Sequence, residues 1–516
     1  MSQVRFFSSA SLAHARCDCQ QGIGCAHVVL AIWACRQARD SHPGVQEVTL
    51  EVAPPGVAIG SDAPGLMASA AAIRLPQAVQ DWLWSLWRDG ASQPLLALEA
   101  RYQALIADLS QLGWTWVRQE LDGVWQILQA LTRRSNRYEI GDLVKASAQL
   151  HLRLQGAAHA DATPGARVPA SQILGIGQQG EVALDLLRLI SLGMVCWRDD
   201  VSEGASIIFA DPNSQAACVL ERAWPCGADE PDDIGSLLKR RVAGIALRLL
   251  AAGQLVTKAA KRRANASLEL GAKAQHTSVL ALSPKAWDDL RAPLRFATLS
   301  DLLRHQRSRP PAAIGSGEAG GNWHVVDLSQ LTLDDWAWDG AGQTLLARWT
   351  DTGGLTLRAS LTYQSFCAGA VDALARALAG QWGAVRALAG PVWREGGGLA
   401  MRPMSIMTAQ RAVVLALEPQ APQQMALREL ALEARASQAL LRESLGLLCQ
   451  LMRQGLRHSP PSLHARLLAQ AGQLDAAGYG HAARLLRGVC PDGRDGAGLA
   501  RLTALTMLLG ALLDRV

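Results

Sequence analysis

The spacing of apolar residues predicts two helical parts of the chain. Residues 70–156 form a helical region, because apolar side chains recur there on one helical face, as at Trp82, Leu83 and Leu86. Residues 422–516 follow a proline-containing stretch and are expected to form a C-terminal helical bundle. The tryptophans of the first region could stack on bases, but at helical spacing they are expected in the core; they are Trp114, Trp116 and Trp125.

Between the helical parts, the pattern changes to short apolar runs separated by turn residues, which is typical of β-strands. Residues 165–300 are expected to form a β-rich unit with strands at 182–184, 192–197 and 206–210 and one central helix over 234–252. Residues 322–417 form a second β-rich unit with strands at 324–326, 344–349 and 355–361. A flexible Pro/Gly/Ser stretch, 309–321, joins the two units. Whether they form one domain is left open.

The first forty residues combine two short strands with a helix. Residues 4–7 and 12–16 read as strands around Ser8 and Ser9. An apolar helical face follows, formed by Val28, Ala31, Ile32 and Cys35. Residues 1–40 are therefore a small unit of their own, and the fold class is α+β multidomain. A further strand is expected at 46–52.

One internal repeat lies in the two helical parts. In each copy a glycine followed by an aromatic residue would end one helix and admit a tight turn into the next. Duplication of a helical hairpin explains the repeat, and so does the general likeness of leucine-rich hairpins. The matching residues are Ala100, Arg101, Leu109, Gly113, Trp114, Leu121, Gly123 and Val124 in the first copy, and Ala465, Arg466, Leu474, Gly478, Tyr479, Leu486, Gly488 and Val489 in the second.

Composition narrows the class of protein. Apolar residues make up 49% of the chain and charged residues 18%, which are ordinary globular values and exclude wholesale disorder. The net charge of +5 neither demands nor excludes a nucleic-acid partner. No apolar run reaches the ~20 residues that span a bilayer, and the N-terminus lacks the apolar core of a signal peptide. We therefore expect a cytoplasmic protein without a membrane partner.

A cluster of metal-ligand residues lies in the N-terminal unit. Cys17 and Cys19 are two apart, so on an extended segment both thiolates face the same way. Cys25 and His27 follow after a glycine-containing spacer. Three thiolates and one imidazole form a closed set that suits tetrahedral Zn²⁺. The alternative is free thiols beside a core histidine. We assign Cys35 to the core, and His14 is a weaker substitute ligand.

The pattern C-x-C-x5-C-x-H before an apolar helix resembles the SWIM zinc finger, a small ββα module. The resemblance implies that Cys17, Cys19, Cys25 and His27 bind zinc.

The order of finger, helical region, two β-rich units and helical tail resembles the long bacterial SWIM proteins. It implies a non-enzymatic adaptor whose finger docks protein or DNA. It also implies a partner such as a MoxR-type AAA+ ATPase or a von Willebrand A domain protein. The contact surface would be the hairpin tip 8–10 and the loop 20–24, where Ile23 is either an anchor or a lid over the thiolates.

Basic residues give a rival function, nucleic-acid binding through the 239–263 region. Such a cluster could neutralise phosphates, but a solvated helix face with a basic loop, or pairing with distant acids, is the favoured explanation. The candidate residues are Lys239, Arg240, Arg241, Lys258, Lys261, Arg262 and Arg263.

Catalytic motifs are missing from the sequence. The chain contains no G-x-x-x-x-G-K-[ST], no H-E-x-x-H, no G-x-S-x-G and no strand-linked G-x-G-x-x-G. We therefore expect a protein that is not an enzyme. An active site assembled from distant residues is the third class of function, and one sequence cannot display it.

Overall fold

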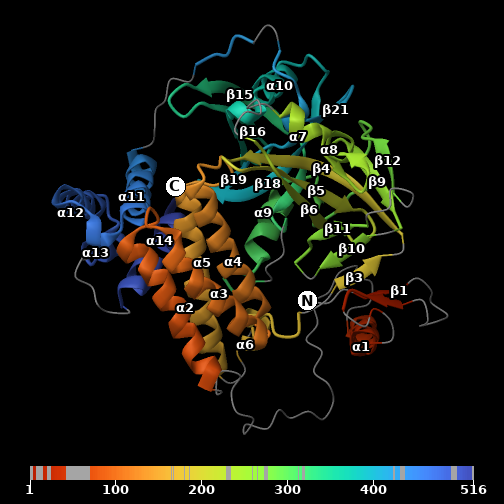
Figure 1. Ribbon diagram of the computed structural model, residues 1–516. Coiled ribbons are helices and arrows are strands. Elements are labelled where there is room, and N and C mark those ends of the chain that lie inside the picture. The colour runs from red at the N-terminus through yellow and green to blue at the C-terminus, as the bar shows by residue number, and fades with distance from the viewer. Residues whose placement is uncertain are drawn as a thin grey trace.

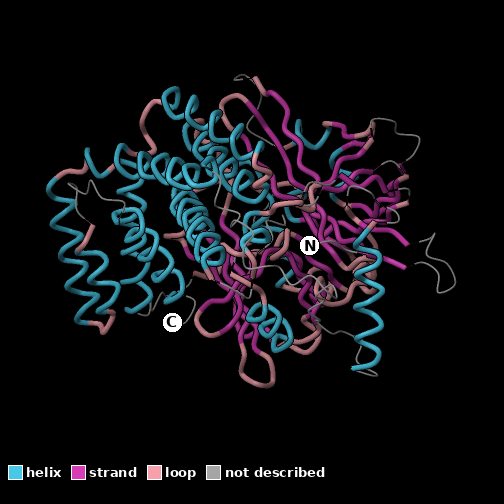
Figure 2. Tube along the Cα trace, turned by 90° about the horizontal axis from the view of Figure 1, so that it is seen from below, coloured by secondary structure: helices cyan, strands magenta, loops and turns pink. Residues whose placement is uncertain are grey.

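The protein has an α+β architecture in which a group of long helices lies on one side of the molecule, and the strands, with the remaining helices among and beside them, lie on the other (Figures 1 and 2). The computed structural model describes residues 4–6, 15–19, 22, 25–41, 70–163, 166, 168–178, 181–184, 186–227, 234–258, 260–263, 265–271, 277–311, 313–315, 320–421, 425–429, 436–489 and 497–513. The expected strand at 46–52 lies outside these residues.

The N-terminal unit is a ββα arrangement, as expected. Strands β1 (Val4–Phe6) and β2 (Ala15–Cys17) pair antiparallel, with Val4 opposite Cys17. Helix α1 (Ala26–Ser41) packs on the hairpin through Val28. In Figure 1 this unit lies beside the β-rich part of the molecule.

The two helical parts of the chain share a single hydrophobic core. Buried residues such as Leu121 and Leu150 from the first part belong to the same cluster as Leu448 and Leu505 from the second. From the sequence these parts are expected to be separate units, because contacts between such distant segments leave no local pattern. The helices are α2 (Ala70–Asp89), α3 (Leu95–Gln111), α4 (Thr115–Thr132), α5 (Ile140–Ala162), α6 (Ala170–Leu174), α11 (Ala436–Gln454), α12 (Pro461–Ala476), α13 (Gly480–Arg487) and α14 (Ala497–Leu513), with the 3-10 turn η5 (Leu456–His458).

Two glycines make the joint between these helical parts. Gly90 and Gly455 both have a positive φ, +88° and +85°. A Cβ atom on Gly90 would lie 2.6 Å from the backbone of Gln454. The amide of Ala91 donates to the carbonyl of Met452 at 2.7 Å. Only residues without a side chain allow the two backbones to approach this closely.

The repeated hairpin has the same turn in both copies. Gly113 and Gly478 have positive φ, and the next amide donates back to the helix in both cases, from Trp114 to Leu109 at 3.0 Å and from Tyr479 to Leu474 at 2.8 Å. This hydrogen bond is the helix C-cap that a left-handed glycine makes possible. The prediction that glycine ends each first helix is confirmed. Trp114, Trp116 and Trp125 are buried in the core, as expected.

The first β-rich unit contains a five-stranded and a three-stranded sheet, and all its expected strands are present. One sheet has the order β12-β9-β4-β5-β6 and the other β11-β10-β3. The strands are β3 (Glu181–Leu184), β4 (Leu187–Arg198), β5 (Ser202–Asp211), β6 (Ala216–Pro225), β9 (Gly253–Thr257), β10 (Ala260–Arg263), β11 (Leu268–Leu270) and β12 (Thr277–Ala281).

The prediction of one helix over 234–252 is wrong. The segment forms α7 (Gly235–Lys239), a hairpin of β7 (Arg241–Val242) and β8 (Ile245–Ala246), and α8 (Leu247–Ala251). Ala243 and Gly244 have positive φ and make the hairpin turn. Arg240 leaves the helical conformation and its guanidinium pairs with the buried carboxylate of Glu203 at 2.9 Å. This tertiary contact outweighs the local preference for helix.

The second β-rich unit also has its expected strands. Its sheet has the order β13-β14-β18-β19-β17-β16-β15, and β20 joins β18 to β21. The elements are β13 (Arg295–Phe296), α9 (Leu299–Ser308), β14 (Trp323–Asp327), β15 (Thr332–Asp339), β16 (Thr344–Thr350), β17 (Thr356–Thr362), η3 (Ser365–Cys367), α10 (Gly369–Leu378), β18 (Val385–Glu395), β19 (Gly398–Met401), β20 (Ser405–Thr408), β21 (Ala412–Val414) and η4 (Leu415–Leu417).

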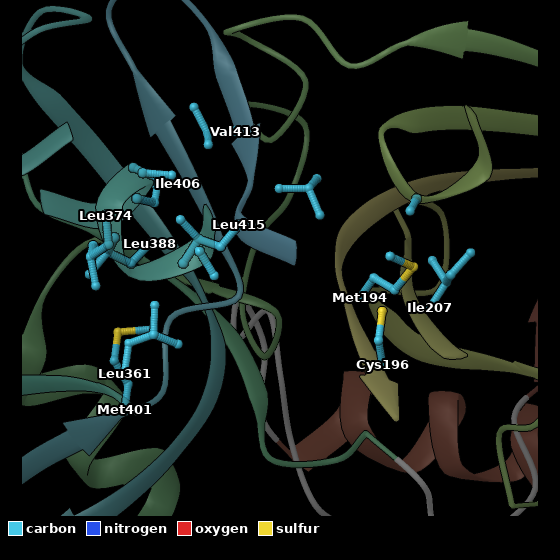
Figure 3. Close-up of a cluster of buried hydrophobic side chains, with 14 of the residues drawn as sticks. Met194, Cys196, Ile207, Leu361, Leu374, Leu388, Met401, Ile406, Val413 and Leu415 are labelled. Carbon is cyan, nitrogen blue, oxygen red and sulfur yellow. The ribbon is translucent and has the colours of Figure 1, made fainter. Parts of the chain in front are cut away.

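The two β-rich units pack on each other. Met194 and Ile207 of the first unit and Leu388 and Met401 of the second belong to one buried cluster, which Figure 3 shows. The other face of β4 contributes Ile190 to a second cluster. Strand β4 is therefore buried on both faces, which explains its nearly continuous apolar sequence.

Among the helices that the structure describes, none combines the length and the apolar character needed to cross a bilayer.

Candidate metal centre

The predicted ligands are held by the end of β2 and the start of α1. The amide of Cys17 donates to the carbonyl of Gly22 at 2.8 Å, and the amide of Gly22 donates to the carbonyl of Cys19 at 3.0 Å. Gly22 has a positive φ of +66°, so the chain turns back sharply after the first two cysteines. Cys25 directly precedes α1, and its carbonyl accepts the amide of Val28 at 3.0 Å. Cys25 and His27 thus lie at the positive end of the helix dipole, which favours thiolates.

The four side chains converge on one point. The ligand atoms of Cys17, Cys19, Cys25 and His27 all lie within 4.8 Å of one another. Cys17 and Cys25 are buried, Cys19 is half-buried and His27 is exposed. The prediction that these four residues lie close enough to bind one metal ion is confirmed. A closed set of four such donors is the composition of a structural site, since it leaves no open position for a substrate.

The cysteines differ in acidity. Burial raises the pKa of Cys17 to about 12. Burial also acts to raise the pKa of Cys19, but hydrogen bonds with His27 and Cys25 outweigh it and lower that pKa to about 6. A metal ion must displace the proton from Cys17, so binding releases protons and weakens as the pH falls.

The core beneath the site is small. It consists of Ala15, Cys17, Cys25 and Val28, with Val4, Cys19 and Ile32 packed at its edge. Two of its four buried members are ligands. So little apolar surface cannot hold a separate unit together without a metal or contacts to the body.

The outer face of α1 carries exposed apolar side chains. Val29 is 52% exposed, Leu30 37% and Trp33 38%. They face away from the small core, in which Val28 is buried on the opposite side of the helix. Exposed Cys35 also lies on α1, so our assignment of this residue to the core is wrong.

Ion pairs attach the N-terminal unit to the first β-rich unit, and two of them, between described residues, were not expected from the sequence. Arg5 of β1 pairs with Asp211 at the end of β5 at 2.9 Å. Asp18, between two ligands, pairs with Arg262 of β10 at 3.5 Å. Asp18 could have been noticed as the charged residue inside the C-x-C motif. No local signal identifies its distant partner.

The basic residues of the 239–263 region do not gather in one place. Lys239 ends α7, Arg240 follows it and Arg241 begins β7. In Figure 1, α7 lies apart from β10, the strand that carries Lys261, Arg262 and Arg263. Arg240 pairs with Glu203, Arg262 with Asp18, and Arg263 with Glu269. Arg241 donates to the carbonyl of Gly244, and Lys239, Lys258 and Lys261 are exposed.

Several residues of the predicted contact surface lie outside the described residues. They are the hairpin tip 8–10 and the loop 20–24, including Ile23, apart from Gly22. The substitute ligand His14 also lies outside the described residues.

Comparison with known proteins shows the family to which the chain belongs. A family model described as the YehQ four-helical bundle domain matches residues 71–175, and one described as the YehQ C-terminal OB-fold domain matches residues 320–436. No SWIM family model matches, and no solved structure matches. The chain is 34% identical over 473 residues to Protein YehQ of Escherichia coli (strain K12), a match that covers 90% of this chain and 75% of that relative. The chain therefore belongs to the YehQ family.

Proposed function

We propose that the protein is a zinc-binding adaptor without catalytic activity, whose N-terminal unit is a SWIM-type finger. The observation that carries the proposal is the convergence of Cys17, Cys19, Cys25 and His27, whose ligand atoms lie within 4.8 Å of one another. Three thiolates and an imidazole favour Zn²⁺ over harder cations such as Mg²⁺ and Ca²⁺. The closed donor set supports a structural ion that holds the finger in shape.

The finger is the docking element of the proposed adaptor. Val29, Leu30 and Trp33 on α1 are apolar, exposed and held on a rigid helix, and aromatic anchors of this kind dominate protein interfaces. The resemblance of the ligand spacing to SWIM fingers supports a MoxR-type AAA+ ATPase or a von Willebrand A domain protein as the partner.

Binding of purified partner tests this function. The chain and a purified MoxR-type ATPase or von Willebrand A domain protein from the same organism are mixed, and their affinity is measured with and without a zinc chelator. The proposal expects binding that the chelator abolishes and that Trp33→Glu weakens at least tenfold. Leu96→Glu is the matched control, because Leu96 is 80% exposed on α3, in the helical unit. The proposed role is contradicted if the affinity is unchanged both by the chelator and by Trp33→Glu, or if the chain binds neither partner.

Nucleic-acid binding is the second candidate. It is supported by the exposed Lys239, Lys258 and Lys261 and by the OB-fold match, since OB-folds bind oligonucleotides among other ligands. The pairing of Arg240, Arg262 and Arg263 with acids argues against a single phosphate-binding surface.

A further inference from the structure

The N-terminal unit is attached to the body on both sides of its hairpin. Arg5, on β1, reaches Asp211, whose side chain is only 1% exposed. Asp18, directly after β2, meets Arg262, whose side chain is 11% exposed. Arg262 belongs to β10, which pairs with β3 and β11. Because both pairs include a largely buried partner, solvent screens them less than ordinary surface ion pairs.

Asp18 links the metal centre to the body through its two carboxylate oxygens. One oxygen, Oδ1, lies 3.9 Å from the Sγ atom of Cys17. The other, Oδ2, lies 3.5 Å from Nη2 of Arg262. Three thiolates and a neutral imidazole around a divalent ion carry one net negative charge, and Asp18 adds another. A cation fixed beside Asp18 offsets this accumulation of negative charge.

The surroundings of Arg262 indicate that its position is built into the sheet. Burial raises the pKa of the Cys218 thiol, on β6, to about 11, while the positive charge of Arg262 acts to lower it. Arg263, next on the same strand, pairs instead with Glu269 of β11 at 2.6 Å and is 52% exposed. The two neighbouring arginines therefore make different contacts. Arg263 links β10 to β11 within its own sheet, and Arg262 contacts Asp18, which lies between Cys17 and Cys19.

We propose that Arg262 is a positioning residue of the metal centre, and that metal binding is coupled to docking of the N-terminal unit on β10. This inference rests on the proposed function, because it requires the four-ligand site to bind zinc. Asp18 lies between Cys17 and Cys19, so a metal ion that fixes these two cysteines also fixes the position from which Asp18 meets Arg262. The coupling is reciprocal: whatever factor docking contributes to zinc affinity, zinc contributes to docking.

Zinc affinity of the full-length chain tests the positioning role. Competition with a colorimetric zinc chelator gives the dissociation constant for wild type, Arg262→Ala, Arg262→Lys and Arg263→Ala. Residues outside the ligand set typically contribute ten- to hundredfold to metal affinity, so we expect Arg262→Ala to bind zinc at least about tenfold more weakly. Arg262→Lys keeps the charge and should recover part of the loss. Arg263→Ala removes a charge from the same strand and should match wild type.

Hydrogen exchange tests the reverse direction of the coupling. In the wild type, zinc removal should increase exchange in peptides that cover residues 15–19 and 260–263, and should leave residues 344–350 of β16 unchanged. In Arg262→Ala, residues 260–263 should exchange fast with or without zinc. If wild type binds zinc but Arg262→Ala binds it equally well, the inference is overturned while the proposed function stands. If wild type binds no zinc, the proposed function fails and the inference fails with it.

Discussion

The guanidinium of Arg5 donates to the carboxylate of Asp211 at 2.9 Å, although the two residues are 206 positions apart. Asp211 also accepts the amides of Asn213 and Ser214 and the hydroxyl of Ser214. Burial acts to raise the pKa of Asp211, but these donors and Arg5 outweigh it, so the pKa lies below its usual value. The carboxylate thus organises its own turn and also anchors the N-terminal unit.

This relationship predicts unequal effects of removing the two partners. Asp211→Ala removes the shared acceptor of Arg5 and of three donors in the turn, which are part-buried, and should lower the free energy of unfolding by about 3 kcal/mol. Arg5→Ala leaves the carboxylate with its three local donors and should lower it by about 1 kcal/mol. Urea denaturation followed by circular dichroism measures both. Equal losses in the two variants would show that the turn does not depend on Asp211.

The glycine joint of the helical unit predicts a second asymmetry. Gly90→Ala forces a Cβ into the Gln454 backbone at positive φ and should destabilise the protein by about 2–4 kcal/mol. Gly446→Ala is the matched control, because Gly446 lies inside α11 with nothing within 4 Å of its added Cβ. Gly446→Ala should stabilise the protein by up to about 1 kcal/mol. Thermal unfolding of both variants measures the difference. Similar melting temperatures would mean that the two helical parts do not meet at Gly90.

The sequence predicts those structural features that are determined by residues close together in the chain. The metal-ligand cluster is predictable because Cys17, Cys19, Cys25 and His27 are neighbours in the chain. The hairpin turns are predictable because Gly113 and Gly478 act within their own hairpins. The expected helix over 234–252 failed because Glu203, a distant residue, holds Arg240 out of the helix. Contacts between remote segments, such as Asp18 with Arg262, leave no trace in periodicity or spacing.

A buried histidine predicts acid sensitivity. His324 of β14 is 2% exposed, Nδ1 donates to the carbonyl of Pro293 at 2.8 Å, and Nε2 accepts from Gln306 at 3.0 Å. Burial lowers its pKa to about 4, below the usual 6.5. The unfolded chain therefore binds the proton first, so stability is fully present above pH 6.5 and is lost as the pH falls toward 4.

Measured unfolding free energies between pH 7 and pH 4 test this behaviour. The fall in wild type should reach up to about 3 kcal/mol from this group. His324→Gln cannot gain the proton, so its stability should change less over the same range. Parallel pH curves for wild type and His324→Gln would contradict the assignment.

Nucleic-acid binding can be tested without disturbing the metal centre. Arg262 faces Asp18, so the exposed Lys239 and Lys258 are the better positions for charge reversal. We expect weak binding of single- and double-stranded DNA at most. If a shift occurs at low salt, Lys239→Glu with Lys258→Glu should reduce it, and physiological salt should weaken it steeply. If the wild-type protein does not shift the mobility of DNA at low salt, the chain is not a nucleic-acid-binding protein.

Metal content tests the central claim most directly. Elemental analysis of protein purified without chelator should give about one zinc per chain, because four donors complete one tetrahedral site. Cys17→Ser should lose the zinc, while Cys35→Ser should keep it, because Cys35 is an exposed thiol of α1 outside the four-ligand cluster. Wild type with no zinc, or with iron in its place, would contradict the account.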